Sequence, residues 1–153
     1  MEEVIKKEKI DVVIIDSISS PIRTAFWTAQ ENYPARADAM SLIMGELTRL
    51  QDMYDVIILT THHASMNPTN PYDTTAMMRG GIVAKYYSKR VVYINKRGKK
   101  GFENYRKFWL VRAEDQPEWS MATVAKITDV GYVDVPKEEW DDVFTDAEKK
   151  KID

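Results

Sequence analysis

Residues 11–16, Asp-Val-Val-Ile-Ile-Asp, decide the fold, because four consecutive apolar residues are followed at once by a carboxylate. An apolar run of this length is typical of a fully buried strand in a parallel sheet. Parallel sheets bind their ligands at the carboxyl ends of the strands. Asp16 and the following Ser17 would lie at such an end, so we predict that they belong to a ligand-binding site.

A strand-end aspartate has a known use in ATPases of the P-loop class. It holds a magnesium ion, usually through water, while a separate Gly-x-x-x-x-Gly-Lys-Ser/Thr loop holds the phosphates. The 153 residues contain no such loop. We therefore expect that this chain alone does not bind ATP, although Asp16 has the place of a magnesium ligand. The competing interpretation is an aspartate that only caps the turn after the strand.

The next segments predict an α/β architecture. Apolar residues spaced three and four apart predict a helix over residues 35–54, and residues 56–60 form a second apolar run. The order strand, helix, strand implies two parallel strands joined by a right-handed crossover. The apolar positions of the predicted helix are Met40, Ile43, Met44, Leu47, Leu50 and Met53.

The rest of the chain predicts loops and antiparallel strands. Residues 18–34 and 64–81 are expected to be loops, and the second of these is long enough to suggest a functional role. A short apolar stretch after Gly81 and the later apolar runs predict antiparallel strands, and residues 136–153 are expected to form a peripheral tail with Trp140 and Phe144 packed down. The later runs are 91–94, 108–111 and 122–127.

Composition limits the possible classes of protein. A length of 153 residues fits one domain, and we expect a single domain over residues 1–153. The net charge of −2 argues against binding to nucleic acid by bulk charge alone. The chain has no cysteine, which excludes disulfides and thiolate metal sites. No signal peptide or membrane span is visible, so an intracellular, cytoplasmic protein is the expectation.

Several segments, in this order and at this spacing, resemble the core of RecA/RadA-type recombinases. The first group comprises Asp11 to Ser20, Ala35-Arg36 and Thr61-His62-His63. The second group comprises Gly80-Gly81, Ser88 and Arg90 before a Val-Val-Tyr-Ile strand, the acidic segment Glu114-Asp115-Gln116-Pro117-Glu118, and Lys126-Ile127-Thr128 with Gly131. The resemblance implies a partial RecA-like core that lacks the P-loop portion. It also implies a role in DNA recombination and repair, with ATP and magnesium as ligands and single-stranded DNA as a partner.

The resemblance assigns roles to individual residues. It implies nucleotide binding by Asp16, Ser17 and His63, with Asp16 as the metal ligand and Asp16 and His63 as the catalytic pair. It implies that Glu114, Asp115 and Pro117 cap ATP bound to a neighbouring subunit. DNA contacts fall on Arg36, Arg79, Gly80, Gly81 and Lys85.

Two positions depart from the family pattern. The family usually has Thr-Asn-Gln after the second strand, where the glutamine senses the terminal phosphate, and this chain has His63 instead. Imidazole can also donate to a phosphate, and it can change charge near neutral pH. Where the family tends to have a histidine after the glycine pair, this chain has Lys85 and Tyr86.

Three functional alternatives remain open from the sequence. The chain can be part of a larger recombinase core that is completed by another chain or by a portion outside these 153 residues, or a truncated, non-catalytic paralogue that acts as a DNA-binding or regulatory module on recombinase filaments. Self-association or a RadA-like recombinase partner is expected. A small metal-dependent hydrolase using Asp16, His62 and His63 is disfavoured, because successive residues of an extended chain point to opposite faces. A basic cluster with Phe102 and Tyr105 between its cations suits either single-stranded nucleic acid or a solvated hairpin. Its cations are Lys96, Arg97, Lys99, Lys100, Arg106 and Lys107.

Overall fold

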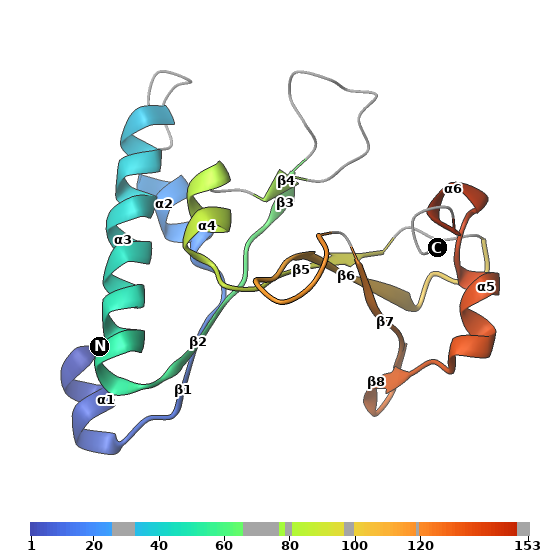
Figure 1. Cartoon of the computed structure of the whole chain (residues 1–153), viewed down its shortest axis with the longest axis horizontal. Helices are drawn as coiled ribbons and strands as arrows, with labels where there is room; N and C mark the ends of the chain where they lie inside the picture. Colours follow the sequence, from blue (N-terminus) through green and yellow to red (C-terminus); the bar gives the residue numbers. More distant parts are fainter. Residues whose placement is uncertain (26–32, 66–76, 79–80, 97–99, 119, 150–153) are drawn as a thin grey trace. The chain divides into compact units, whose positions relative to one another are not determined.

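The computed structural model describes residues 1–25, 33–65, 77–78, 81–96, 100–118 and 120–149. The chain forms two compact units, Met1–Tyr87 and Ser88–Asp153, which we describe one at a time (Figure 1). The single domain expected from the sequence stays a prediction. None of the described helices combines the length and the hydrophobicity that a bilayer-spanning segment requires.

The first unit contains the predicted parallel pair. Strand β1 (Val12–Ile15) pairs with β2 (Ile57–Thr60) in parallel, with Val12 opposite Ile57 and Ile15 opposite Thr60. Helix α3 (Tyr33–Tyr54) lies between them in the chain and forms the crossover (Figure 1). The predicted strand, helix, strand order is therefore confirmed, as is the mixed α/β fold class.

One face of this parallel sheet is covered by helices. Helices α1 (Glu2–Glu8), α2 (Ser19–Ala25) and α4 (Gly81–Tyr87) join α3 in covering it. Two clusters of buried side chains form the core on this face, and Val13, Ile15 and Ile58 of the strands pack against them. The first cluster is Ile18, Ile22, Met40, Met44, Leu47 and Ala84, and the second is Ile5, Leu50 and Val56.

The opposite face of the sheet, which we call the open face, is apolar and exposed. Val12 and Ile14 of β1 are 45% and 67% exposed, and Ile57 and Leu59 of β2 are 60% and 52% exposed. The prediction of a fully buried strand at residues 12–15 is therefore wrong for every second residue. The reason is the pleat of the strand, which directs alternate side chains to opposite faces, so that only one set reaches the helices.

Two helices lie where the sequence predicted other structure. Helix α2 occupies part of the predicted loop 18–34, because Ile18 and Ile22, spaced four apart, both reach the core. Pro21 falls in the first turn of α2, where the missing N–H has no intrahelical partner to lose. The apolar stretch after Gly81, predicted as a strand, is helix α4, which buries Ala84 completely.

The ends of the long loop 64–81 are also more ordered than predicted. Strand β3 (Ala64–Ser65) pairs antiparallel with β4 (Met77–Met78). Residues 66–76 and 79–80 lie outside the described part of the chain. The helix predicted over residues 35–54 is confirmed, but two members of its expected buried stripe are exposed, Ile43 by 38% and Met53 by 57%.

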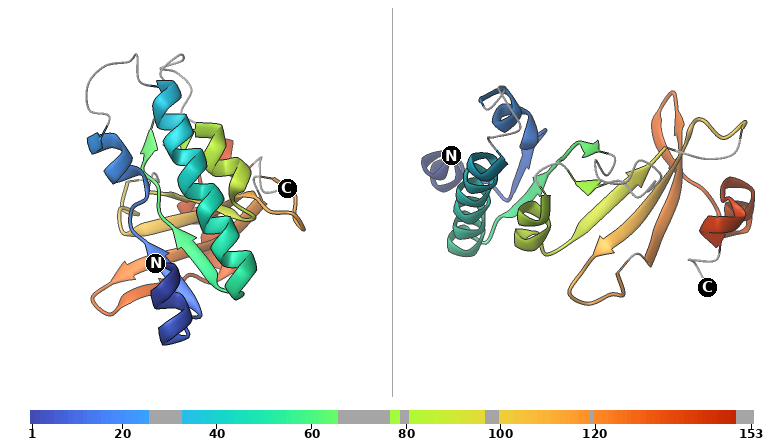
Figure 2. Two further views of the ribbon diagram at one scale, coloured as in Figure 1. Left: turned by 90° about the vertical axis from the view of Figure 1, so that its left-hand side faces the viewer. Right: turned by 90° about the horizontal axis from the view of Figure 1, so that it is seen from above.

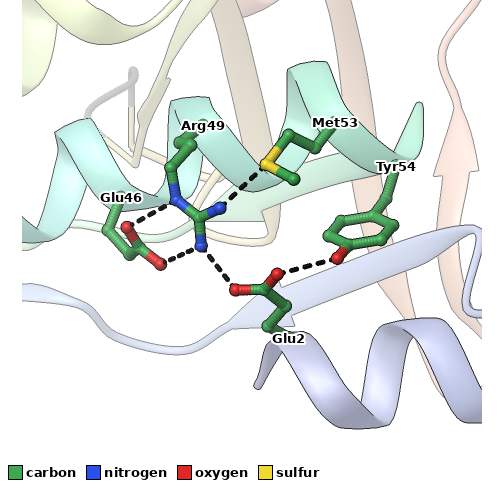
Figure 3. Close-up of polar contacts among 5 residues, drawn as sticks. All are labelled: Glu2, Glu46, Arg49, Met53 and Tyr54. Atoms are coloured by element: carbon green, nitrogen blue, oxygen red, sulfur yellow. Dashed lines mark hydrogen bonds and ion pairs between the residues drawn. The ribbon is translucent and has the colours of Figure 1, made fainter.

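A polar network holds α1 against the last turns of α3 (Figure 3). The Arg49 guanidinium donates to both carboxylate oxygens of Glu46, at 2.9 and 2.7 Å, and to Glu2 Oε2 at 2.6 Å. The Tyr54 hydroxyl donates to the other Glu2 oxygen at 2.7 Å. These hydrogen bonds hold the pKa of the Glu2 carboxyl, and that of Glu46, below its usual value. One arginine thus connects the N-terminal helix to the crossover helix.

The second unit is a four-stranded antiparallel sheet with a helical tail (Figure 2). Its strands run in chain order and confirm the predicted antiparallel arrangement, to which β8 adds a strand that was not predicted. Trp109, Val124, Val135, Val143 and Phe144 form its core, which confirms that the tail packs down through Phe144. The elements are β5 (Val91–Asn95), β6 (Tyr105–Arg112), β7 (Ser120–Thr128), β8 (Gly131–Asp134), η2 (Lys137–Glu139), α5 (Trp140–Val143) and α6 (Asp146–Lys149).

Candidate functional site

The carboxyl ends of β1 and β2 are joined by backbone hydrogen bonds. The Thr61 N–H donates to the Ile15 carbonyl at 3.0 Å, and the Ile18 N–H donates to the Thr61 carbonyl at 3.2 Å. These bonds continue the parallel ladder past its last paired residues. The segments 16–20 and 61–63 are therefore held side by side, and we call this place the strand-end site.

Asp16 lies at the strand-end site with its side chain exposed. The Thr61 hydroxyl donates a hydrogen bond to Asp16 Oδ1. An ionised carboxylate has room for several more donors or for a hydrated cation, so this single bond orients Asp16 without saturating it. The orientation comes from the neighbouring strand, which is an arrangement suited to a fixed metal-binding or water-binding group.

His63 meets two serine hydroxyls across the site. Its Nε2 lies 3.2 Å from Ser20 Oγ and 3.4 Å from Ser17 Oγ, and the two hydroxyl oxygens are 2.7 Å apart. The His63 backbone N–H donates to the Ser19 hydroxyl at 3.5 Å. These contacts position the imidazole between two elements, since Ser20 belongs to α2 and Ser17 follows β1. The hydroxyls can rotate to donate or accept, so the cluster can adapt to an anion.

The two adjacent histidines have different partners. His62 Nε2 lies 3.2 Å from the Thr60 hydroxyl, whereas His63 contacts the serines. Within the described ranges, no three His, Cys, Asp or Glu side chains gather closely enough to hold a metal ion. A cation at Asp16 would therefore need further oxygen ligands from water or a phosphate, which is common for Mg²⁺.

The structure brings together three of the residues that the sequence assigned to nucleotide binding, namely Asp16, Ser17 and His63. It adds Ser20 and Thr61, which sequence reasoning did not assign to the site. Ser20 was missed because residues 18–34 predict a loop, whereas helix α2 begins at Ser19 and carries Ser20 to His63.

The residues assigned to DNA binding are only partly described. Arg36 is half-buried near the start of α3, and Lys85 is half-buried in the last turn of α4, which packs against α3. Gly81 is the first residue of α4. Arg79 and Gly80 lie outside the described residues. Burial of Ala84 fixes α4 against the core, so the position of Lys85 is set by packing.

The acidic segment 114–118 belongs to the second unit, between β6 and β7. Glu114, Asp115 and Pro117 are all exposed. Asp115 Oδ2 accepts a hydrogen bond from Arg90 Nη2 at 2.9 Å, an exposed ion pair that ties this segment to the residue before β5. The segment is thus oriented at one point, while the Glu114 side chain is exposed.

Part of the described basic cluster is used for packing, whereas Lys96 and Lys100 are exposed. Phe102 and Tyr105 pack against the core of the second unit, and their rings meet edge to face with centroids 5.0 Å apart. Lys107 is only 2% exposed, and its Nζ lies 5.1 Å from the centroid of the Phe144 ring. Arg106 donates to the backbone carbonyls of Glu103 and Tyr105. These contacts favour a structural role over a stacking surface for nucleic acid.

The proteins to which the chain is similar include two archaeal DNA repair and recombination proteins. The chain is 33% identical over 98 residues to the DNA repair and recombination protein RadB of Methanosphaera stadtmanae, a match covering 63% of this chain and 40% of that protein. It is 29% identical over 130 residues to the DNA repair and recombination protein RadA of Aeropyrum pernix, covering 85% of this chain and 39% of that protein. No protein-family model matches the chain. The chain thus spans about two fifths of the length of these curated relatives.

Proposed function

We propose that the chain, which is similar over part of its length to RadA and RadB proteins, forms the part of a recombinase core that binds nucleotide phosphates at the strand-end site and single-stranded DNA beside it. The observation that carries this proposal is the meeting of Asp16, Ser17, Ser20, Thr61 and His63 at the carboxyl ends of two parallel strands. Parallel α/β sheets bind their ligands at this edge.

In this proposal, Asp16 holds the hydrated magnesium ion of an ATP complex. The Thr61 hydroxyl keeps the carboxylate turned toward the site, so that it does not have to be ordered when the ion arrives. Phosphate oxygens of a bound nucleotide and water molecules would supply the further oxygen ligands that Mg²⁺ requires. We assign the remaining phosphate contacts to a glycine loop of the P-loop type, supplied by the polypeptide that completes the site.

His63 acts in this proposal as the sensor of the terminal phosphate. A protonated or suitably oriented neutral imidazole can donate from Nε2 to a phosphate oxygen. Its present contacts with Ser17 and Ser20 would then be exchanged for the anion, and the released hydroxyls could also donate to it. The backbone of His63 leads directly into β3 and the segment 64–81, which gives a covalent route from the nucleotide to the DNA-binding segment.

We assign DNA contact to the segment 64–81 with Arg36 and Lys85. Arginine and lysine contact phosphates without reading the base sequence, and glycines allow the backbone to approach closely. In the second unit, Glu114, Asp115 and Pro117 are assigned to a nucleotide held by a neighbouring subunit, with Arg90 orienting Asp115.

Single-stranded DNA binding tests the DNA part of the proposal. We expect the chain to bind a fluorescent dT oligonucleotide in a salt-sensitive way, and the double substitution Arg79→Gln, Lys85→Gln to weaken binding and flatten the salt dependence. Each lost phosphate contact should lower the slope of log K against log salt by about 0.7. Lys149→Gln is the matched control, since it removes a cation from the tail. Equal binding by wild type and the double variant at both low and moderate salt would show that the segment 64–81 does not contact DNA.

ATP hydrolysis tests the nucleotide part. We expect the chain alone to hydrolyse no ATP, because its side chains cannot enclose the triphosphate. If the purified chain hydrolysed ATP and Asp16→Ala left the rate unchanged, both the nucleotide role of the strand-end site and the role of Asp16 would be wrong.

A further inference from the structure

The thioether of Met53 takes part in the polar network between α1 and α3 (Figure 3). Met53 Sδ accepts a hydrogen bond from Arg49 Nη1 at 2.8 Å. The two residues are four apart on α3, so their side chains lie on the same face of the helix. The guanidinium that holds Glu2 of α1 is therefore also in contact with a sulfur atom, and the proposed function does not use this sulfur.

Met53 is far more accessible than the core methionines of the same helix. It is 57% exposed, whereas Met40 and Met44 are 2% and 5% exposed. The chain has no cysteine, so its oxidisable sulfur atoms are all thioethers of methionine. A dissolved oxidant reaches side chains on the surface before those in the core. Of these three methionines, Met53 is therefore the one that such an oxidant would modify first.

Hydrogen peroxide oxidises a thioether without any cofactor. A lone pair of Sδ attacks one peroxide oxygen, and the O–O bond breaks as the S–O bond forms. The proton of the transferred oxygen then passes to the departing hydroxide, which leaves as water. Sulfur loses two electrons and becomes a sulfoxide, while the peroxide is reduced. A weak acceptor is thus replaced by a polar group whose oxygen accepts hydrogen bonds well.

The added oxygen does not fit between Met53 and Arg49 as they now lie. A nitrogen donor and an oxygen acceptor are about 2.9 Å apart, and the S–O bond adds to that length, whereas Nη1 and Sδ are separated by 2.8 Å. The guanidinium must move if it is to donate to the sulfoxide oxygen. Of its carboxylate partners, Glu46 lies on α3 itself, but Glu2 lies on α1. Movement of Arg49 therefore acts on the contact between the two helices.

Helix α1 depends on such contacts to remain folded. It has seven residues, and helices of this length gain their stability from tertiary packing. Ile5 packs with Leu50 and Val56, and Glu2 also accepts a hydrogen bond from the Tyr54 hydroxyl. Loss of the bond between Glu2 and Arg49 would leave these contacts in place. The helix should then open more often without unfolding the rest of the first unit.

We propose that Met53 is a site of reversible oxidation by peroxide, and that its sulfoxide draws Arg49 away from Glu2 and loosens α1. The sulfoxide is reversible because methionine sulfoxide reductases return it to the thioether. The effect requires neither nucleotide nor DNA, since each group involved belongs to α1 or α3.

Limited treatment of the chain with hydrogen peroxide tests this site. By tandem mass spectrometry of its peptides, we expect the sulfoxide to form several times faster at Met53 than at Met40 or Met44. Hydrogen exchange of the α1 amides should then become about two- to fivefold faster, the range that corresponds to the loss of one exposed ion pair. Methionine sulfoxide reductases A and B, added together, should restore the original exchange rate.

Two variants separate the effect of Met53 from general oxidative damage. Met53→Leu keeps an apolar side chain of similar volume but has no sulfur, so peroxide should leave its α1 exchange unchanged although the other methionines remain. Arg49→Ala already lacks the bond to Glu2, so α1 should exchange faster before treatment and gain nothing from it.

Several results would overturn the role of Met53. They are oxidation of Met53 no faster than that of Met44, and unchanged α1 exchange in the oxidised wild type. Equal acceleration by peroxide in Met53→Leu or in Arg49→Ala would overturn it as well, because the effect would then not pass through these two side chains. A change that the reductases do not reverse would show that the modification is not the reversible sulfoxide.

Discussion

The two faces of the β1–β2 sheet are formed by alternate residues of the same two strands, yet helices cover only one of them in the described part of the first unit. Val13, Ile15 and Ile58 meet the buried side chains of four helices, while Val12, Ile14, Ile57 and Leu59 are about half exposed or more. The composition of the two faces is almost equal, so hydrophobicity alone does not decide burial. What differs is whether the described part of the first unit supplies a covering layer of helices, and that is a property of topology.

The largest expected effect comes from truncating matched leucines on the two sides. Leu50 is 2% exposed in the covered core, and Leu50→Ala should lower the free energy of unfolding by about 2–5 kcal/mol. Leu59 is 52% exposed on the open face, and Leu59→Ala should change it by only about 0.5 kcal/mol. Urea unfolding followed by the helical circular dichroism signal measures both. Similar losses for the two variants would mean that both faces of the sheet are equally well packed in solution, which would contradict the difference in burial described here.

A smaller effect is expected from making the open face polar. Ile14→Thr with Leu59→Thr keeps β-branched or strand-compatible side chains and removes apolar surface from the patch. The double variant should bind less of an apolar fluorescent dye and resist aggregation better than wild type, because large exposed apolar patches promote association. Leu42→Thr on α3 serves as the control. Unchanged dye binding in the double variant would show that the patch is already covered.

The smallest effect concerns the attachment of α1 to the covered side. The pKa values of the Glu2 and Glu46 carboxyls are lowered, chiefly by hydrogen bonds from Arg49. A lowered pKa in the folded state adds stability above the unfolded value of about 4.3, and this contribution is lost as the pH falls below it. Arg49→Gln should therefore reduce the difference in urea midpoint between pH 6 and pH 3. An unchanged difference would show that the hydrogen bonds of Arg49 do not contribute to the pH dependence of stability.

The strands and the crossover were predictable because their signals are local. An apolar run at residues 12–15 and a period of three to four at residues 35–54 each need only their own sequence to be recognised. Helices α2 and α4 were missed because each is seven residues long and gains its stability from the core through Ile22 or Ala84. Short helices depend on tertiary packing more than on propensity.

The strand-end site was only partly predictable for a similar reason. Asp16 and His63 follow apolar strands and match a family pattern, so the sequence indicates them directly. Ser20 and Thr61 join the site through a helix and a cross-strand contact that the pattern does not contain. The exposure of Ile14 was unpredictable because an apolar side chain does not indicate which face of its strand the helices cover.

Calorimetric titration of ATP with magnesium tests the central claim that the strand-end site is half of a nucleotide site. We predict no binding by the chain alone, binding when the chain is co-expressed with the part of Methanosphaera stadtmanae RadB outside the 98 matched residues, and at least tenfold weaker binding when the co-expressed chain carries Asp16→Asn. Asp142→Asn is the matched control, since it removes an exposed carboxylate of the tail and should leave affinity unchanged. Tight binding by the chain alone, with the same affinity in Asp16→Asn, would contradict the account.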